Sequence, residues 1–423
     1  MIGDLDFDAY APDNCVIRDL DLPISYSPSL DVGGLKTEYN QDISGVLADS
    51  SHVVLQLGGK FGRIGESIIT SAFIYPVHEA LLMLGRHDTK ITLIVDRGVS
   101  CLYDRQLYSF NLGRQLDVIP ADPSLSNSVA QKLCSSGEEN IFLFDFNGGN
   151  EKHPQYMCLE FSNAKCRHRI SVLSNLFRSS VRCFAALGAL ERYARFIEHI
   201  LVLPSGSVDR NRSQPNILLG DQDELRYEQL MSQLAFDPSS INITCFFQSV
   251  VSAKCYGHWE DVLMGISNFL KRIRRDKMVN FIMACNSDDS QSQRFSAKDL
   301  REQFTGFSGA NNARCVVCQI SLRDVAIVSK HSVMTLSNDT GPAHIAGAVG
   351  TPVVVPFLPG NVYSMAVWSS SLPFRGLTLE PNPYRFDEIR DAVAYGYTHI
   401  IDSIQPEVLI QRAVDTLLDN GIV

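Results

Sequence analysis

The chain has 423 residues, a length that suits two domains better than one because single domains usually hold roughly 100 to 200 residues. Apolar residues make up 45% and charged residues 20% of it, as in an average globular protein, so long disordered or low-complexity regions are not expected. The net charge of −10 argues against nucleic acid as the main partner, since binding a phosphate backbone requires clustered Lys and Arg.

The first 50 residues are rich in Asp, Pro, Ser and Gly and show no sustained period, which predicts an N-terminal extension. Residues 1–8 are acidic and lack the basic and apolar regions of a secretory signal. Apolar stretches such as 345–357 fall short of the roughly 18 to 20 residues that span a bilayer. The eleven cysteines have no regular spacing. We therefore expect a cytoplasmic protein with reduced thiols and at most peripheral membrane contact.

Apolar runs alternate with helical periods through residues 51–210, which we expect to form the first domain. The expected elements, in chain order, are a strand at 52–57, a helix at 66–85, a strand at 91–95, a helix at 99–111, and strands at 116–119 and 141–146. This rhythm predicts a parallel sheet covered on both faces. A helical period at 171–203 ends at Pro- and Gly-containing residues 204–216, which we interpret as the linker.

The same rhythm returns in residues 211–423, the expected second domain. The expected strands are 242–248, 278–284, 313–319, 332–336 and 352–357, and the expected helices are 259–274, 296–304, 322–330, 341–349 and an amphipathic tail at 405–418. The sequence thus predicts an α/β protein with two Rossmann-like domains. Ligands of such sheets bind beyond the carboxyl ends of the strands.

The turn at Asp339, Thr340 and Gly341 follows a buried strand and opens a helix. A helix start presents backbone N–H groups and the positive end of its dipole, which suits a phosphate. Thr340 adds a hydroxyl, and Gly341 lets a ligand approach the backbone. An ordinary capped helix is the alternative. His344 follows in the first turn, where it either faces a ligand or packs on the sheet.

Glu66 follows the first strand and a glycine-rich loop at 58–65, and it opens a helix. Catalysis by this carboxylate competes with a simpler explanation, because carboxylates also stabilise helix N-termini. The loop resembles a phosphate or sugar cradle but contains no complete GxGxxG or Walker pattern, so dinucleotide binding is not expected.

No metal site is expected. Cys315 and Cys318 have the spacing of a zinc or redox pair, but no second pair follows, and on a strand they would face opposite sides. The group formed by His153, Cys158, Cys166 and His168 matches no standard zinc spacing.

The stretch Ser-Asn-Asp-Thr-Gly-Pro-Ala-His-Ile-Ala-Gly-Ala-Val-Gly-Thr-Pro-Val-Val at 337–354 resembles the nucleotide-diphosphate signature of the heptosyltransferase-like glycosyltransferases. This resemblance implies the GT-B fold, in which two Rossmann-like domains face each other across a cleft and a C-terminal helix crosses back toward the first domain. It also implies that the donor contacts Asp339, Thr340, Gly341 and His344.

Two further segments carry the resemblance. Residues 58–70 resemble the family's first turn, where an acidic residue, usually Asp, is taken as the base that activates the acceptor; here that residue is Glu66. Residues 247–259 resemble the element with a Lys and a Trp that contacts donor phosphate; Gly257 stands where the family often has Lys, and Lys254 is the substitute. The same comparison implies a ribose contact for Asp289, and acceptor or cleft contacts for Lys60, Arg63, Gly65, Asn361 and Tyr363.

The function implied is an inverting, metal-independent glycosyltransferase without a cofactor. Its donor would be a nucleotide-diphosphate sugar, with an ADP-sugar and heptose or a related sugar favoured by the resemblance. Its acceptor would be a hydroxyl of a glycan, a lipid-linked molecule or a natural product. Two alternatives remain open, a GT-B-fold sugar-nucleotide 2-epimerase and a non-catalytic sugar-nucleotide-binding subunit.

Overall fold

The computed structural model describes residues 16–19, 47–57, 64–121, 141–145, 166–171, 198, 206–209, 215–237, 239–249, 251–286, 297–304, 307, 312–358, 374–380 and 386–421. The chain divides into two units. The N-terminal unit comprises Ile24–Leu218, and the C-terminal unit comprises Leu219–Val423 together with Met1–Pro23. Within the described part of the chain, no helix is both long and apolar enough to cross a bilayer.

The N-terminal unit contains a five-stranded parallel sheet in the order β4-β3-β2-β5-β6. Its strands are β2 (His52–Gln56), β3 (Lys90–Asp96), β4 (Leu116–Ala121), β5 (Ile141–Asp145) and β6 (Cys166–Ser171). Its helices are α2 (Ile64–Ser71), α3 (Ile74–Met83), the 3-10 turn η3 (Ser100–Leu102) and α4 (Arg105–Leu112). All five residues of β2 are buried, including the polar His52 and Gln56 on either side of the apolar run that predicts this strand.

Two helices of this unit differ from their predicted bounds. The helix expected at 66–85 is two helices, because Pro76 lacks an N–H and is compatible only with the first turn of a helix, here that of α3. The helix expected at 99–111 begins later, at Arg105, where the Asp104 carboxylate accepts hydrogen bonds from the backbone N–H groups of Gln106 and Leu107 at 2.8 and 2.9 Å.

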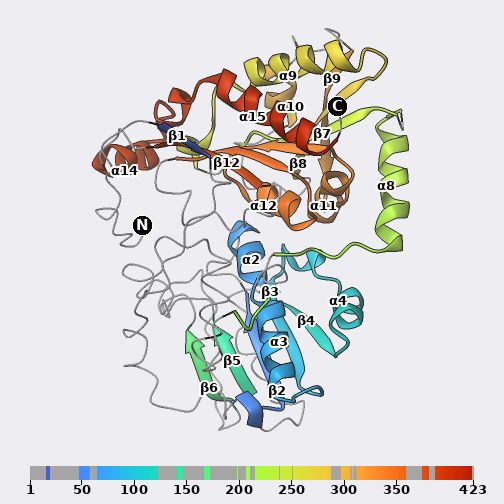
Figure 1. Cartoon of the computed structure of the whole chain (residues 1–423), viewed down its shortest axis with the longest axis vertical. Helices are drawn as coiled ribbons and strands as arrows, with labels where there is room; N and C mark the ends of the chain where they lie inside the picture. The colour runs from blue at the N-terminus through green and yellow to red at the C-terminus, as the bar shows by residue number, and fades with distance from the viewer. Residues whose placement is uncertain are drawn as a thin grey trace. The chain divides into compact units, whose positions relative to one another are not determined.

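The C-terminal unit contains a seven-stranded sheet in the order β1-β12-β11-β10-β7-β8-β9 (Figure 1). Its strands are β7 (Ile241–Phe246), β8 (Val279–Asn286), β9 (Ala313–Ile320), β10 (Met334–Ser337), β11 (Val353–Pro356), β12 (Phe374–Glu380) and β1 (Val16–Asp19). Six strands are parallel, and β1 joins β12 antiparallel. The N-terminal extension therefore contributes a strand to this unit.

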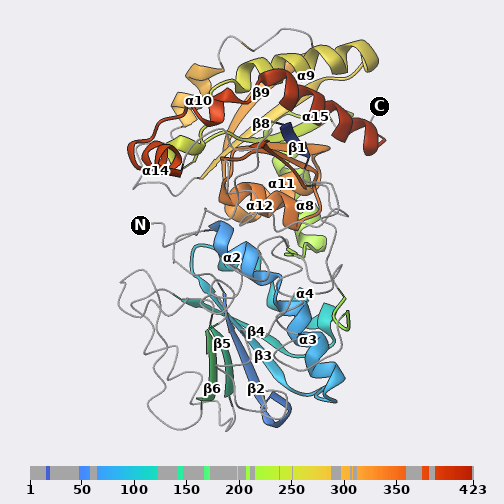
Figure 2. The same ribbon diagram turned by 60° about the vertical axis from the view of Figure 1, so that its left-hand side comes forward.

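Helices cover both faces of the seven-stranded sheet. In Figures 1 and 2, α9 (Trp259–Ile273), α10 (Ala297–Gln303) and α15 (Pro406–Asp419) lie on one face, and α11 (Leu322–Lys330) and α12 (Gly341–Ala348) lie on the other. The core below α9 and α15 includes Trp259, Phe281 and Leu409, all without exposed surface. The remaining elements are α8 (Asp221–Gln233), η6 (Ser252–Lys254), α14 (Phe386–Tyr395) and η8 (Ile401–Ser403).

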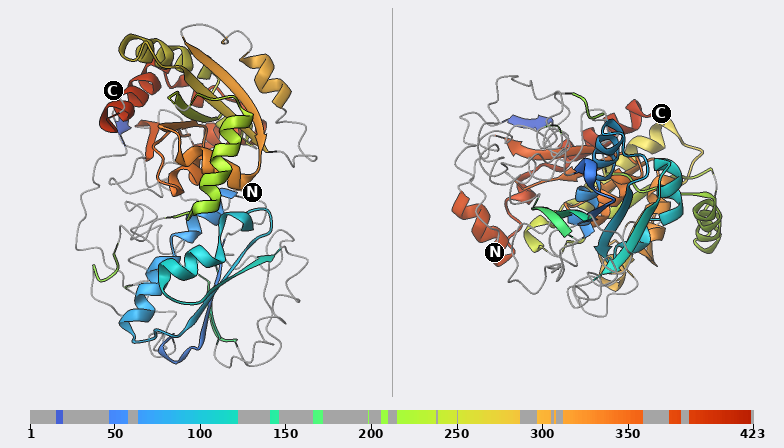
Figure 3. Two further views of the ribbon diagram at one scale, coloured as in Figure 1. Left: turned by 90° about the vertical axis from the view of Figure 1, so that its right-hand side faces the viewer. Right: turned by 90° about the horizontal axis from the view of Figure 1, so that it is seen from below.

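Helix α8 lies beside α11, as the left panel of Figure 3 shows, and crossed ion pairs hold the two together. Arg226 of α8 binds both carboxylate oxygens of Asp324 at 2.8 and 3.0 Å, and Arg323 of α11 binds both oxygens of Asp223 at 2.8 and 2.6 Å. Each Asp also accepts from the N–H that precedes its own helix. Although burial raises the pKa of Asp324, its hydrogen bonds from Arg226 and Ser321 hold that pKa below its ordinary value.

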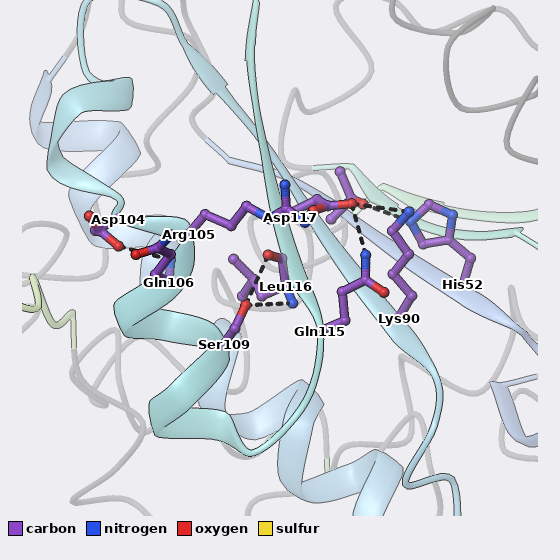
Figure 4. A network of polar contacts seen from close by, with 10 residues as sticks. His52, Lys90, Asp104, Arg105, Gln106, Ser109, Gln115, Leu116 and Asp117 are labelled. Atoms are coloured by element: carbon purple, nitrogen blue, oxygen red, sulfur yellow. Dashed lines mark hydrogen bonds and ion pairs between the residues drawn. The ribbon is translucent and has the colours of Figure 1, made fainter.

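A polar network closes the amino ends of the strands in the N-terminal unit (Figure 4). His52 Nε2 lies 2.8 Å from the hydroxyl of Thr92, while Asp117 binds Lys90 at 3.1 Å and Arg105 at 2.9 Å. Burial, aided by the nearby Lys90 charge, lowers the pKa of His52 to about 4. This network lies at the edge opposite to the one where parallel sheets bind ligands, so its role is structural.

We predict that acidification from pH 7 to pH 5 removes up to about 2 kcal/mol of stability through His52, because the unfolded imidazole binds a proton near pH 6.5 and the folded one does not. The folded pKa is lowered, so stability rises with pH between about 4 and 6.5 and is lost on acidification. Unfolding by urea at both pH values should show a smaller loss for His52→Gln than for the parent.

His87→Gln is the matched control, since His87 is an exposed histidine of the same unit. It should keep the full pH dependence of the parent. An equal pH dependence in His52→Gln and the parent would contradict the assignment.

Candidate functional site

The strand order of the C-terminal unit places β7 next to β10, and the two pair in parallel to their last residues, Phe246 and Ser337. Strands β8 and β9 extend the sheet to one side of this pair, and β11 and β12 extend it to the other. Such a reversal of strand order opens a crevice at the carboxyl ends, where open α/β sheets bind ligands. The segments after β7 and β10 therefore border the candidate site.

An ion pair joins these two segments. Lys254, at the end of η6, approaches the Oδ2 atom of Asp339 to 2.5 Å. The Asp339 side chain is only 3% exposed, and that of Lys254 is 15% exposed. An ionised carboxylate this deeply buried requires a partner, because burial of an isolated charge is costly. The sequence analysis assigned Lys254 to the donor phosphate; the structure has its ammonium against Asp339, and the phosphate contact remains a prediction.

His344 lies behind the ion pair. Its Nε2 atom is 4.0 Å from Oδ1 of Asp339, and its side chain is 2% exposed. Burial lowers the pKa of His344 to about 4; Asp339 opposes this change and the Lys254 charge adds to it. The imidazole is therefore neutral at pH 7. Of the two positions that the sequence allowed for His344, the structure has the buried one.

Thr340 and Gly341 form the more accessible part of the turn. Ser337, Asn338 and Asp339 are buried, whereas Thr340 and Gly341 are partly exposed. Thr340 is the N-cap of α12 with extended backbone angles, and its side chain makes no capping hydrogen bond; its hydroxyl lies 3.4 Å from that of Ser337. The Ala343 N–H already donates to the Thr340 carbonyl. The hydroxyl of Thr340 and the backbone of Gly341 thus offer polar contacts at the positive end of the helix.

Asn338 connects the two segments, and sequence reasoning gave it no role. Its side chain is fully buried and contacts Phe247, Tyr256 and Trp259, which are 79 to 91 residues away. The only signal in the sequence was a polar residue directly after a short apolar strand. That signal does not identify partners so distant along the chain.

In the N-terminal unit, Gly65 and Glu66 lie in the first turn of α2, soon after β2, the strand at which the order of that sheet reverses. The side chain of Glu66 lies outside the described part. The start of α2 is held by Tyr103, whose buried hydroxyl donates to the Ser67 carbonyl at 3.1 Å. Burial raises the pKa of Tyr103 to about 12, so this donor keeps its proton.

Several predicted residues lie outside the described residues. They are Lys60 and Arg63 before α2, Asp289 after β8, and Asn361 and Tyr363 after β11. Their predicted contacts remain predictions.

No group of three His, Cys, Asp or Glu side chains suitable for a metal ion occurs in the described ranges. Cys315 and Cys318 are free thiols on β9, and burial raises the pKa of each to about 12. Cys166 and His168 lie on β6. A zinc or redox role for Cys315 and Cys318 would require a thiolate, which their burial opposes.

Comparison with known proteins gives a consistent result. Residues 270–385, which include the Asp339 turn, match the model of Glycosyltransferase family 9 (heptosyltransferase). Lys254 precedes the matched segment. No curated protein matches the chain.

Solved structures share the fold at low identity. A family 9 glycosyl transferase from Veillonella parvula DSM 2008 aligns with a TM-score of 0.58 and 15% identity over 87% of this chain and 97% of its own. The ADP-heptose lps heptosyltransferase II of E. coli aligns with a TM-score of 0.53 and 14% identity over 88% of this chain and 99% of its own. The two sheets, parallel except for β1, are those of a GT-B α/β protein. The chain therefore resembles glycosyltransferase family 9 (heptosyltransferase) over β8 to β12, and it shares the fold of these two solved structures over most of its length.

Proposed function

We propose that the protein transfers a sugar, heptose or a related one, from a nucleotide-diphosphate sugar to a hydroxyl of a glycan, lipid-linked or natural-product acceptor, with inversion and without a metal ion. The observation that carries this proposal is the Lys254–Asp339 ion pair at the reversal of strand order, beside the accessible start of α12. The name of the E. coli relative, an ADP-heptose lps heptosyltransferase, favours an ADP-sugar as donor and a lipid-linked acceptor.

In this proposal Asp339 acts through Lys254. A carboxylate in direct contact with a diphosphate would repel it, and the Asp339 side chain is almost fully buried. An ammonium has three donors, so Lys254 can bind Asp339 with one and a phosphate oxygen with another. Asp339 thus fixes the cation, and neutral His344 fills the space behind the carboxylate without adding charge.

The donor diphosphate would rest against Lys254, the Thr340 hydroxyl and the backbone of Gly341. As the bond between the anomeric carbon and the diphosphate oxygen breaks, the leaving group takes the electron pair. Preorganised donors aimed at this growing negative charge stabilise the transition state, typically by about 3 to 4 kcal/mol for a single donor. Asp289 would contact the donor ribose.

Glu66 would be the general base. It would accept the proton of the acceptor hydroxyl while the oxygen attacks the anomeric carbon from the face opposite the diphosphate, which inverts the configuration. Its support is its position in the first turn after β2 and the resemblance of residues 58–70 to the family's first turn. Lys60, Arg63, Gly65, Asn361 and Tyr363 would contact the acceptor or border the site.

We predict that one nucleoside diphosphate in a panel of ADP, UDP, GDP, CDP and dTDP stabilises the parent against thermal unfolding. At about 100 times the dissociation constant, the gain should be near 2.7 kcal/mol. Asp339→Ala should abolish it, because Lys254 loses the carboxylate that fixes it. Lys298→Ala, which removes an exposed lysine of the same unit, should retain it. No stabilisation of the parent by any nucleotide would overturn the proposed donor class.

We predict that Glu66→Gln keeps the nucleotide-dependent stabilisation and loses turnover by about 10²–10⁴-fold, because the amide cannot accept the proton. The assay is release of the nucleoside diphosphate from its sugar, with and without a panel of hydroxyl acceptors.

Undiminished release by Glu66→Gln would remove Glu66 from catalysis. Conversion of the donor sugar into its epimer without an acceptor would indicate the epimerase instead. A parent that binds the nucleotide and turns over no sugar would indicate a binding subunit.

A further inference from the structure

We propose that Asn338 is a positioning residue that holds Lys254 in place for the donor. The inference rests on the proposed function, because it gives Lys254 the task of binding phosphate. Asn338 directly follows β10 and precedes Asp339, so one residue connects the anion of the pair with the segment that carries the cation.

The Asn338 side chain makes three hydrogen bonds to the segment 247–259. Its Oδ1 atom accepts from the Tyr256 backbone N–H at 3.2 Å and from the indole N–H of Trp259 at 2.9 Å, and its Nδ2 atom donates to the Phe247 carbonyl at 2.5 Å. Two donors face the oxygen and an acceptor faces the nitrogen, so the partners fix the orientation of the amide. An aspartate or a leucine could not satisfy all three partners.

These contacts lie on both sides of Lys254 along the chain. Phe247 precedes it, and Tyr256 and Trp259 follow it. Between them a 3-10 turn is closed by bonds from Lys254 N–H to Val251 O and from Cys255 N–H to Ser252 O, at 2.9 and 2.8 Å. With both ends of a short, tightly turned segment held to the residue next to Asp339, the ammonium has little freedom to leave the carboxylate.

Other contacts secure the outer side of this segment. The Tyr256 hydroxyl donates to the Ile404 carbonyl at 2.7 Å, and the Gly257 N–H donates to the Asp402 carboxylate at 2.7 Å. A Cβ atom at Gly257 would lie 3.2 Å from that carboxylate oxygen, so the backbone approaches closely here. These contacts fix the segment to η8 and the residue that follows it, whereas Asn338 fixes it to the turn after β10.

The strength of the Asn338 contacts follows from burial. Asn338 and Trp259 have no exposed surface, and the ring of Phe247 stacks on that of Trp259 with 4.4 Å between the ring centroids. Removing the amide would leave two N–H groups and a carbonyl in a dry environment without these partners, which costs more than an exposed hydrogen bond would. The segment would move to satisfy them, and Lys254 would move with it. A displacement of about 1 Å is enough to impair a catalytic arrangement by about 10²-fold.

The first test measures Lys254 directly and requires no nucleotide. The full-length parent and Asn338→Ala are treated briefly with acetic anhydride, and mass spectrometry compares acetylation of Lys254 with that of exposed Lys298. We expect slow modification of Lys254 in the parent and several-fold faster modification in Asn338→Ala. An unchanged ratio overturns the inference.

The matched control is Asn280→Ala. Asn280 is also a fully buried amide of this sheet; it donates to Asn242 at 2.8 Å and accepts from Arg314 at 2.7 Å, near the amino end of β8. The Asn280→Ala substitution should lower stability without changing the ratio of Lys254 acetylation to Lys298 acetylation. If Asn338→Ala does not fold, Trp259→Phe removes one donor while keeping a ring against Phe247, and the same faster acetylation is expected. An equal effect of Asn280→Ala would reduce Asn338 to a general stability role.

The second test is a double-mutant cycle on binding of the nucleoside diphosphate that stabilises the parent. Asn338→Ala should weaken binding by about 10-fold in the parent and have almost no effect in Lys254→Met, because coupled residues are not additive. Equal weakening in both backgrounds overturns the inference. A parent that binds no nucleotide would count against the proposed function alone, since the acetylation ratio would still decide the role of Asn338.

Discussion

The C-terminal unit is organised around a buried carboxylate that requires a cation. Asp339 lies buried in the turn after β10, where an unpaired charge would be costly, and Lys254 reaches it from the segment after β7. The order of the sheet places these two segments side by side. A cation needed for stability is thus held at the edge where parallel sheets bind ligands, beside a helix start that favours anions.

Each of the two units uses the first of its parallel strands in the same manner. In both sheets the chain order reverses beside that strand, which is β2 in the N-terminal unit and β7 in the C-terminal unit. The residues soon after β2 include Glu66, and those soon after β7 include Lys254. The proposed base and the proposed phosphate-binding cation therefore occupy equivalent positions in the two sheets, each soon after the strand at which the order reverses. The residue types at these two positions differ.

Much of this arrangement can be predicted from sequence where the signal is local. Strands such as β2 and β11 are short apolar runs, and α9 has a strong helical period, so their positions agree with the sequence prediction. Helix α8 was not predicted, because Leu230 is its one buried residue and ion pairs with α11 stabilise it. Strands β1, β6 and β12 were also missed. The break between α2 and α3 was missed because Pro76, which lies in the first turn of α3, is surrounded by an apolar pattern that predicts one continuous helix.

The same distinction applies to the site. Asp339, Thr340 and Gly341 form a contiguous signal and were predicted, whereas the role of Asn338 depends on partners at least 79 residues away.

Calorimetry tests the central claim most directly. It compares the affinities of a nucleoside diphosphate and of its phosphate-free nucleoside for the parent and for Lys254→Met. The account predicts that Lys254→Met weakens binding of the diphosphate by about 10-fold or more, because a charge-assisted contact is lost. The affinity for the nucleoside should stay unchanged. Equal diphosphate affinity in the two proteins would contradict it.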